Sequence, residues 1–219
     1  MDGGYPFSSK GIIMTSNILL RIFSLGLIVF MSSCDSHTQK QSNIDLSNRT
    51  HQTDEQVHYN QGVTFSKQGK PKEAIAEWEK VIEIDPNHVK AHYNLGIAYQ
   101  HSGQIDKAIG AWKKAASLEP NGSKAYNNLG VAYISQGKLD DAEAILNKAI
   151  AIEENYAKAN YNLARLYARK NQNQQSLKYL QKAITLDAVV LEEAKSNRDF
   201  SDIRQSSEFQ ELIRSFESN

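Results

Sequence analysis

An all-α fold, in which pairs of helices stack into a solenoid, is what the sequence predicts, and three observations predict it. A segment that reads NLGIAY from Asn94 returns as NLGVAY from Asn128, 34 residues later, and looser copies begin at Asn60 and Asn162. A glycine recurs in the middle of most units, and a proline closes two of them. A fixed period of this length is typical of stacked supersecondary units that bury one continuous core.

Within each unit, small and large residues alternate at fixed positions, counted from Glu55, Val89, Ser123 and Ala157 as position one. Position eight is small: Gly62, Gly96, Gly130 and Ala164. Position twenty-four is bulky: Trp78, Trp112, Leu146 and Leu180. A small residue lets a second helix approach closely, and a large one fills the neighbouring gap. We therefore expect two tightly packed helices in each unit.

Residues that favour helix ends mark the boundaries inside a unit. Position fifteen carries Gly69, Gly103, Gly137 and Asn171. Glycine adopts a positive φ without strain and asparagine tolerates it, so the first helix is expected to end there. Pro86 and Pro120 are expected to stop the second helix of their units. Glu154 and Ala188 take the place of this proline in the last two units.

This pattern resembles the tetratricopeptide repeat family, whose units are helix–turn–helix motifs of the same period. The resemblance covers four repeats: residues 55–88, 89–122, 123–156 and 157–190. It implies a right-handed α-solenoid with a C-terminal cap. It also implies an extended concave surface, which favours binding over catalysis.

Residues 191–219 no longer follow the period, and they are interpreted as a C-terminal capping segment. Phe209, Leu212, Ile213 and Phe216 have the i, i+3, i+4, i+7 spacing of one apolar helix face. The last repeat of a solenoid has an exposed side that such a helix can cover. The alternative is that this helix is itself a docking element for another protein.

The amino-terminal segment has the pattern of a signal peptide. Residues 22–31 are an apolar run that follows an arginine, and the run is far shorter than the ~20 residues of a transmembrane helix. Two serines and Cys34 follow, which resembles the lipobox of bacterial lipoproteins. The resemblance implies a signal peptide over residues 1–33, or from Met14 if translation starts there, and a diacylglycerol on Cys34. A non-lipidated secretory signal and an uncleaved anchor are the alternatives.

Residues 34–54 are polar after the cysteine and carry few large apolar groups, so they are predicted to form a disordered tether. The lipid on Cys34 is expected to hold the chain at a membrane, because buried acyl methylenes contribute about 0.8 kcal/mol each. The expected location is the periplasmic or extracytoplasmic face of a bacterial membrane.

In this family the first helix of each repeat lines the concave face, so the resemblance assigns three repeat positions to a peptide-binding groove. Position five supplies Tyr59, Tyr93, Asn127 and Tyr161. Position six supplies Asn60, Asn94, Asn128 and Asn162. Position nine supplies Val63, Ile97, Val131 and Arg165. Carboxamides can pair with the N–H and C=O groups of an extended peptide, and exposed aliphatic residues beside tyrosines indicate an apolar floor.

Other interpretations of this surface stay open. Asparagine is common at position six throughout the family, so it need not contact a ligand. The C-terminal helix or a second copy of the chain can cover the aliphatic residues. The lysines at position two, Lys90, Lys124 and Lys158, form either a solvated rim or a contact for acidic side chains or a carboxylate.

Composition and motifs argue against several function classes. The chain has 25 basic and 25 acidic residues and no run rich in lysine or arginine, so a nucleic-acid partner is not expected. Its single cysteine allows no internal disulfide. His88 and His92 have no acidic partner at ligand spacing, and no nucleophile elbow or glycine-rich phosphate loop occurs. We expect no enzymatic activity, no cofactor, no metal and no small-molecule substrate.

The predicted function is that of a membrane-tethered scaffold in the bacterial cell envelope. It is expected to bind peptide segments of partner proteins in its concave face and to assist the assembly of complexes. An alternative is an accessory subunit that presents substrates to a separately encoded glycosyltransferase or peptidoglycan enzyme. A third hypothesis, a cytosolic helper, applies if residues 1–33 are not a signal peptide.

Overall fold

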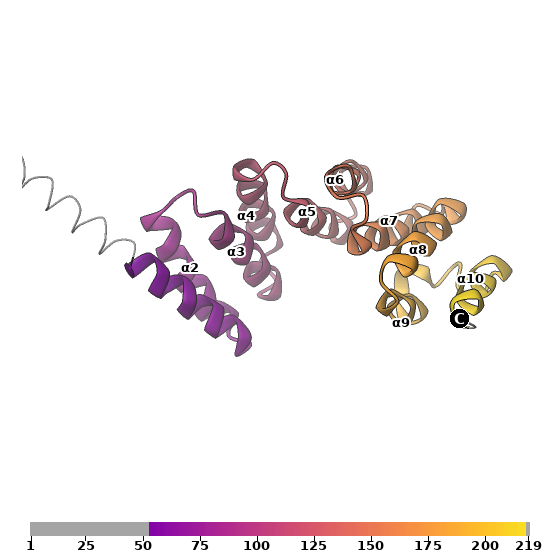
Figure 1. Cartoon of the computed structure of the whole chain (residues 1–219), viewed down its shortest axis with the longest axis horizontal. Helices are drawn as coiled ribbons and strands as arrows, with labels where there is room; N and C mark the ends of the chain where they lie inside the picture. The colour runs from indigo at the N-terminus through magenta and orange to yellow at the C-terminus, as the bar shows by residue number, and fades with distance from the viewer. Residues whose placement is uncertain (1–52, 218–219) are drawn as a thin grey trace, which may run out of the picture. The chain divides into compact units, whose positions relative to one another are not determined.

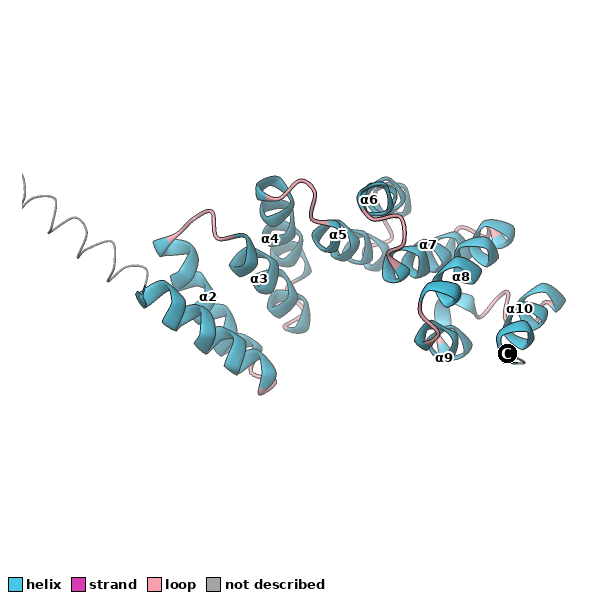
Figure 2. Cartoon of the chain, in the orientation of Figure 1, coloured by secondary structure: helices cyan, strands magenta, loops and turns pink. Residues whose placement is uncertain are grey.

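The structure, a computed structural model, describes residues 53–217, and all regular structure in this range is helical (Figure 2). The predicted signal peptide, Cys34 and nearly all of the predicted tether lie outside the described residues. The first described helix covers residues 53–67, so it begins two residues before the first predicted repeat. The prediction of an all-α fold is confirmed.

The helices follow one another in pairs along the chain (Figure 1). The helix over residues 53–67 pairs with α2 (Pro71–Ile84), and the following pairs are α3 (Val89–His101) with α4 (Ile105–Leu118), α5 (Ser123–Ser135) with α6 (Leu139–Ile152), and α7 (Ala157–Arg169) with α8 (Asn173–Leu186). From α2 to α8, each helix packs against the helices next to it in sequence. Such nearest-neighbour packing is what defines a solenoid.

The turns between paired helices have the backbone that the sequence predicts. Gly69, Gly103 and Gly137 have φ between 70° and 75°, and Asn171 has φ 57°. These are the left-handed conformations that end a helix, and glycine adopts them without a steric penalty. The last repeat therefore keeps the same turn with asparagine in place of glycine.

The second helix of each repeat ends at one repeat position whether or not a proline follows. α2 and α4 end two residues before Pro86 and Pro120, as predicted, and α6 and α8 end at the equivalent Ile152 and Leu186. In all four repeats the backbone N–H of the C-cap residue bonds to the carbonyl four residues earlier. Because helices without a following proline end at the same position, proline is not required for this boundary.

Close packing of the paired helices depends on the small residue at position eight. A Cβ atom added to Gly62 would lie 2.5 Å from the ring of Trp78, and one added to Gly130 would lie 2.5 Å from Leu146. Gly96 and Trp112 repeat this arrangement. Each tryptophan also donates its indole N–H to the carbonyl of position five, at 3.3 Å for Trp78 and 3.2 Å for Trp112. The predicted packing of a small residue on one helix against a large residue on the other is confirmed.

The two ends of the stack differ in how they meet solvent. Positions three, seven and ten of repeats two to four face the preceding repeat and are buried: Ala91, Leu95, Ala98, Ala125, Leu129, Ala132, Ala159, Leu163 and Leu166. The equivalent residues of the first helix are Val57, which is 51% exposed, and the exposed polar residues Gln61 and Thr64. Polar outer faces are characteristic of terminal repeats, so within residues 53–217 this helix has the character of a terminal one.

At the other end, α9 (Val189–Ser196), the 3-10 helix η1 (Arg198–Phe200) and α10 (Ser207–Glu217) cover the last repeat. We call these three elements the cap; it begins two residues before the predicted segment. Phe200, Phe209 and Ile213 are buried in one core with Leu180 and Ala183 of α8, and Leu212 and Phe216 pack beside them. The apolar face predicted for the last helix therefore faces the repeats.

Candidate peptide-binding face

Tyrosines and asparagines assigned to the groove form hydrogen bonds that join one repeat to the next. Asn94 Nδ2 donates to Tyr59 Oη at 3.2 Å, and Asn128 Nδ2 donates to Tyr93 Oη at 3.3 Å. In both pairs, position six of one repeat reaches position five of the preceding repeat, 35 residues earlier. We call this series of contacts between positions five and six the ladder.

The ladder continues through the last two junctions with different partners. Position five of the third repeat is an asparagine, and Asn162 Nδ2 donates to Asn127 Oδ1 at 2.8 Å. Beyond the last repeat, Asn197 Nδ2 donates to Tyr161 Oη at 3.0 Å, across 36 residues. The cap thus supplies the asparagine that a fifth repeat would have supplied.

Most carboxamide oxygens at position six already accept a hydrogen bond within the chain. Asn60 Oδ1 accepts from Gln56, Asn128 Oδ1 accepts from Asn127, and Asn162 Oδ1 accepts from Arg165 Nη1 at 2.9 Å. Among the described position-six residues, Asn94 alone has an Oδ1 without a donor. One asparagine of the predicted set therefore keeps its acceptor available to a ligand.

The cap occupies the groove positions of the fourth repeat. Arg165 Nε donates to Asp199 Oδ2 at 2.8 Å, and the rings of Tyr161 and Phe200 pack with their centroids 5.9 Å apart. Tyr161 and Asn162 are both 7% exposed, and burial raises the pKa of the Tyr161 hydroxyl. At this end of the stack the chain itself covers the predicted surface.

The remaining predicted residues lie toward the amino-terminal end of the stack. Asn127 is buried by its bond to Asn162, whereas Asn128 and Val131 are partly buried. Val63 and Ile97 are also partly buried, and they pack against the cores of the first and second repeats. The surface left for a partner is therefore formed by the first three repeats.

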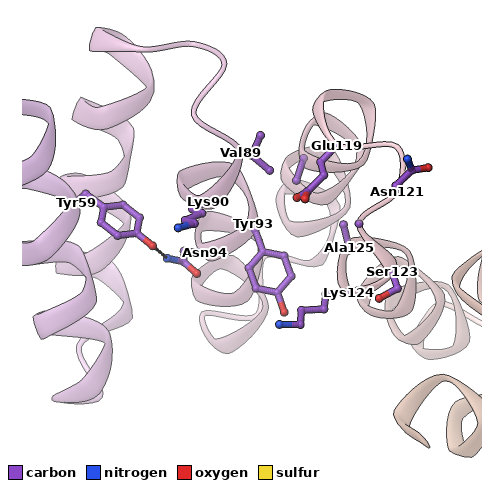
Figure 3. Close-up of a pocket in the computed structure, with 12 residues that line it drawn as sticks. Tyr59, Val89, Lys90, Tyr93, Asn94, Glu119, Asn121, Ser123, Lys124 and Ala125 are labelled. Carbon is purple, nitrogen blue, oxygen red and sulfur yellow. Dashed lines mark hydrogen bonds between the residues drawn. The ribbon is translucent and has the colours of Figure 1, made fainter. Parts of the chain in front are cut away.

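A pocket of about 350 Å³ lies on this surface, next to Asn94 (Figure 3). Its walls include Tyr59, Tyr93 and Asn94 from the predicted groove, together with Lys90 and Lys124. The loop between α4 and α5 closes it with Glu119, Asn121 and Gly122, and α5 adds Ser123 at its first position. Figure 3 shows the Tyr59 hydroxyl directed at the Asn94 amide and the Lys124 side chain extended toward the Tyr93 hydroxyl.

Several residues that matter here were not found by sequence reasoning. Asn197, Asp199 and Phe200 contact the fourth repeat, and Glu119 and Asn121 line the pocket. The cap residues lie outside the period, so no repeat position marked them. The available signal was the pairing of a tyrosine at position five with an asparagine 35 or 36 residues later.

His88 and His92 have structural roles in the described part of the chain. His88 Nδ1 accepts the backbone N–H of Ala91 at 3.0 Å and so caps α3, and His92 Nε2 lies 2.9 Å from the carbonyl of Pro86. Across residues 53–217, no three His, Cys, Asp or Glu side chains gather as metal ligands. No helix in the same range has the length and apolar character needed to span a bilayer.

Family models agree with the repeat geometry. A model described as tetratricopeptide repeat matches residues 88–155 and 123–188, and a model described as TPR repeat matches residues 62–103. The chain belongs to the tetratricopeptide repeat family. No curated protein sequence matches it at a significant level.

Solved tetratricopeptide repeat structures share this fold. A crystal structure of MamA is 25% identical, with a TM-score of 0.61 over 72% of this chain and 92% of that one. PilF from Pseudomonas aeruginosa is 18% identical, with a TM-score of 0.65 over 77% of this chain and 76% of that one. The second TPR domain of human RPAP3, in complex with an HSP70 peptide, is 23% identical, with a TM-score of 0.51 over 53% of this chain and 97% of that one.

Proposed function

We propose that this protein is a non-enzymatic scaffold of the bacterial cell envelope that holds peptide segments of partner proteins on the first three repeats. The observation that carries the proposal is the pocket beside Asn94, where two tyrosines and an unused amide oxygen meet on the face assigned to peptide binding. An amide acceptor next to aromatic rings suits an extended backbone whose side chains pack on either side.

The fold gives further support to a peptide partner. The RPAP3 domain, which has a similar fold, is in complex with a peptide. Aliphatic residues at position nine, such as Ile97, lie one helical turn from position six and extend the apolar part of the surface. The partner therefore has an apolar side chain near the segment that contacts Asn94.

Photo-crosslinking in native membranes tests this surface. A photoreactive amino acid at Lys124, which lines the pocket, should trap a partner, whereas the same group at the exposed Glu83 of α2 should not. Ile97→Asp should abolish the trapped species, because it places a charge on the apolar part of the surface. Equal trapping at both positions, or no effect of Ile97→Asp on a correctly folded protein, would contradict the proposal.

The proposed membrane tether rests on the sequence around Cys34. Metabolic labelling with a palmitate analogue should mark the wild-type protein and should fail to mark Cys34→Ala. The variant should also leave the membrane fraction more readily, because it lacks the acyl methylenes that contribute about 0.8 kcal/mol each when buried. Labelling that persists in Cys34→Ala would rule out this anchor without affecting the proposed binding surface.

A further inference from the structure

The exposed faces of α2 and α4 carry opposite charges at equivalent repeat positions. At positions eighteen, nineteen and twenty-five, the sign of the charge is reversed between the two helices: Lys72 and Asp106, Glu73 and Lys107, and Glu79 and Lys113. All six side chains are exposed. The third and fourth repeats do not continue this pattern, because α6 and α8 have uncharged residues at position twenty-five. The reversal is therefore a property of the first two repeats.

These six charges are not consumed by contacts within the chain. None of them forms an ion pair with any residue between 53 and 217. The ammonium groups of Lys107 and Lys113 lie over the rings of Tyr99 and Tyr133, at 5.4 and 5.8 Å from the centroids. Glu79 accepts the hydroxyl of Tyr99 at 2.6 Å. An ammonium has three N–H donors and a carboxylate accepts several hydrogen bonds, so these groups can still bind an opposite charge.

A small residue lies between the charged positions on both helices. Position twenty-two is Ala76 in α2 and Gly110 in α4, and both residues are exposed. A Cβ added to Gly110 would meet nothing within 4 Å, so packing within the chain does not require glycine there. Glycine also weakens the interior of a helix compared with alanine. The missing side chain gives another helix room to approach α4 closely.

Two-fold symmetry makes this charge pattern self-complementary. α2 and α4 both pack against α3, and each is the second helix of its repeat, so they run in the same direction. A two-fold axis parallel to these helices and between them places α2 of one copy over α4 of the other, with equivalent positions facing each other. All three reversed positions then bring a cation to a carboxylate, and Ala76 meets Gly110. Lys80 and Lys114, at position twenty-six, have like charge, but Lys80 is paired with Glu77 at 2.8 Å.

We propose that the protein forms a two-fold dimer in which α2 of each copy packs in parallel against α4 of the other. Each copy supplies Glu73 and Glu79 to Lys107 and Lys113 of the second copy, and these contacts fix the register of the two chains. None of these residues lines the pocket beside Asn94, so the inference goes beyond the proposed function and does not depend on it. The dimer presents two copies of that pocket, which allows bivalent contact with a partner.

Cysteine cross-linking between two differently tagged full-length copies tests this arrangement. One copy carries Ala76→Cys and the other carries Gly110→Cys, and the co-expressed proteins are treated with a mild oxidant. We expect a disulfide between the two tagged chains, because the two-fold axis brings these positions together. Ala144→Cys in place of Gly110→Cys is the matched control: it is exposed at the same repeat position of α6 and should not cross-link. Copies without an added cysteine give the background from Cys34.

Charge reversal tests the electrostatic basis of the dimer. Glu73→Lys/Glu79→Lys in the copy with Ala76→Cys should lower the cross-linked fraction by about tenfold, because repulsion replaces attraction. Lys107→Glu/Lys113→Glu in the other copy should restore the cross-link, because the opposite charges then face each other again.

The outcomes bear on the dimer alone. Equal cross-linking at Gly110 and Ala144, or no cross-linking at Gly110 in correctly folded proteins, would overturn it. Cross-linking that stays unchanged after charge reversal would also overturn it, because the charges that define the interface would then have no role. Photo-crosslinking at Lys124 tests the proposed function separately, so a failure of one proposal leaves the other standing.

Discussion

The carboxamide of Asn162 donates to Oδ1 of Asn127 at 2.8 Å, and the two side chains are 7% and 4% exposed. This hydrogen bond lies at the junction between the third and fourth repeats. At the first two junctions, the acceptor is a tyrosine hydroxyl instead. A buried amide pair is satisfied only while both partners are present. Loss of either asparagine at this junction therefore leaves the other amide buried without its partner.

Removing one member of this pair should destabilise the protein. Asn162→Ala leaves Asn127 Oδ1 buried without a donor, which costs about 1–3 kcal/mol. The free energy of unfolding in urea measures the loss. Asn60→Ala is the control at the exposed end of the ladder, where a change within about 0.5 kcal/mol is expected. Equal losses of unfolding free energy for the two variants would show that the bond between Asn162 and Asn127 contributes no more than an exposed asparagine does.

The glycine at position eight should not tolerate a methyl group. Gly96→Ala places a Cβ into the ring of Trp112, and overpacking of this kind lowers stability by about 1–3 kcal/mol. Gly110→Ala, in the middle of α4, meets open space and should raise stability by about 0.5–1 kcal/mol through helix propensity. Thermal unfolding of the two variants should therefore shift in opposite directions. Shifts of the same sign would contradict the close-approach argument.

The contact between Arg165 and Asp199 should hold the cap on the fourth repeat. Asp199→Ala removes a hydrogen bond to a charged group, which contributes about 1.5–3 kcal/mol. Amide hydrogen exchange should accelerate in α9 and η1 and stay unchanged in α3. Lys195→Ala, which loses exposed ion pairs with Glu192 and Glu217, is expected to have little effect. If amide exchange accelerated equally throughout the helices of both variants, the bond between Arg165 and Asp199 would not be what holds the cap on the fourth repeat.

Stability should fall in acid partly because Asp140 and Glu143 of the third repeat, which pair with Lys170 of the fourth repeat, become protonated. The Lys170 ammonium donates to Glu143 at 2.6 Å and to Asp140 at 2.8 Å, and these bonds lower the pKa of both carboxyl groups. A lowered folded-state pKa stabilises the protein above the ordinary glutamate value of 4.5, and this stabilisation disappears as pH falls through the folded value.

Lys170→Met tests this linkage. Without the ammonium group, the pKa of Glu143 should return toward its ordinary value, and the stability of the variant should depend less steeply on pH between neutral and acid conditions. Urea midpoints measured across this range for both proteins provide the comparison. Parallel curves would show that other groups account for the acid sensitivity.

Local rules explain why the repeats could be predicted. The turn at Gly103 needs a positive φ, and the space beside Trp112 admits only glycine at position 96, so both requirements are visible in the amino acids themselves. At the end of α8 the sequence has no such marker, because Ala188 replaces the proline. The helix still ends at the same repeat position as the others.

The candidate site was only partly predictable. The resemblance assigned twelve residues to one groove, but Asn127, Tyr161 and Asn162 are buried between repeats or under the cap. Their burial depends on contacts between side chains 35 or 36 residues apart, which a list of equivalent positions cannot reveal. Asn197 could not be found from the period, because it lies beyond the last repeat.

The sequence by itself determined the helix pairs, their turns and the close packing within each repeat, because these depend on residue size and backbone preference at short range. Only the tertiary structure decided which repeats remain open to a partner. Stacking aligns each position-five side chain with position six of the next repeat and places the cap over Arg165. The polar groups in these contacts bond to one another, whereas a single repeat would leave them exposed. Asn94 keeps its acceptor oxygen because no donor from residues 53–217 bonds to it.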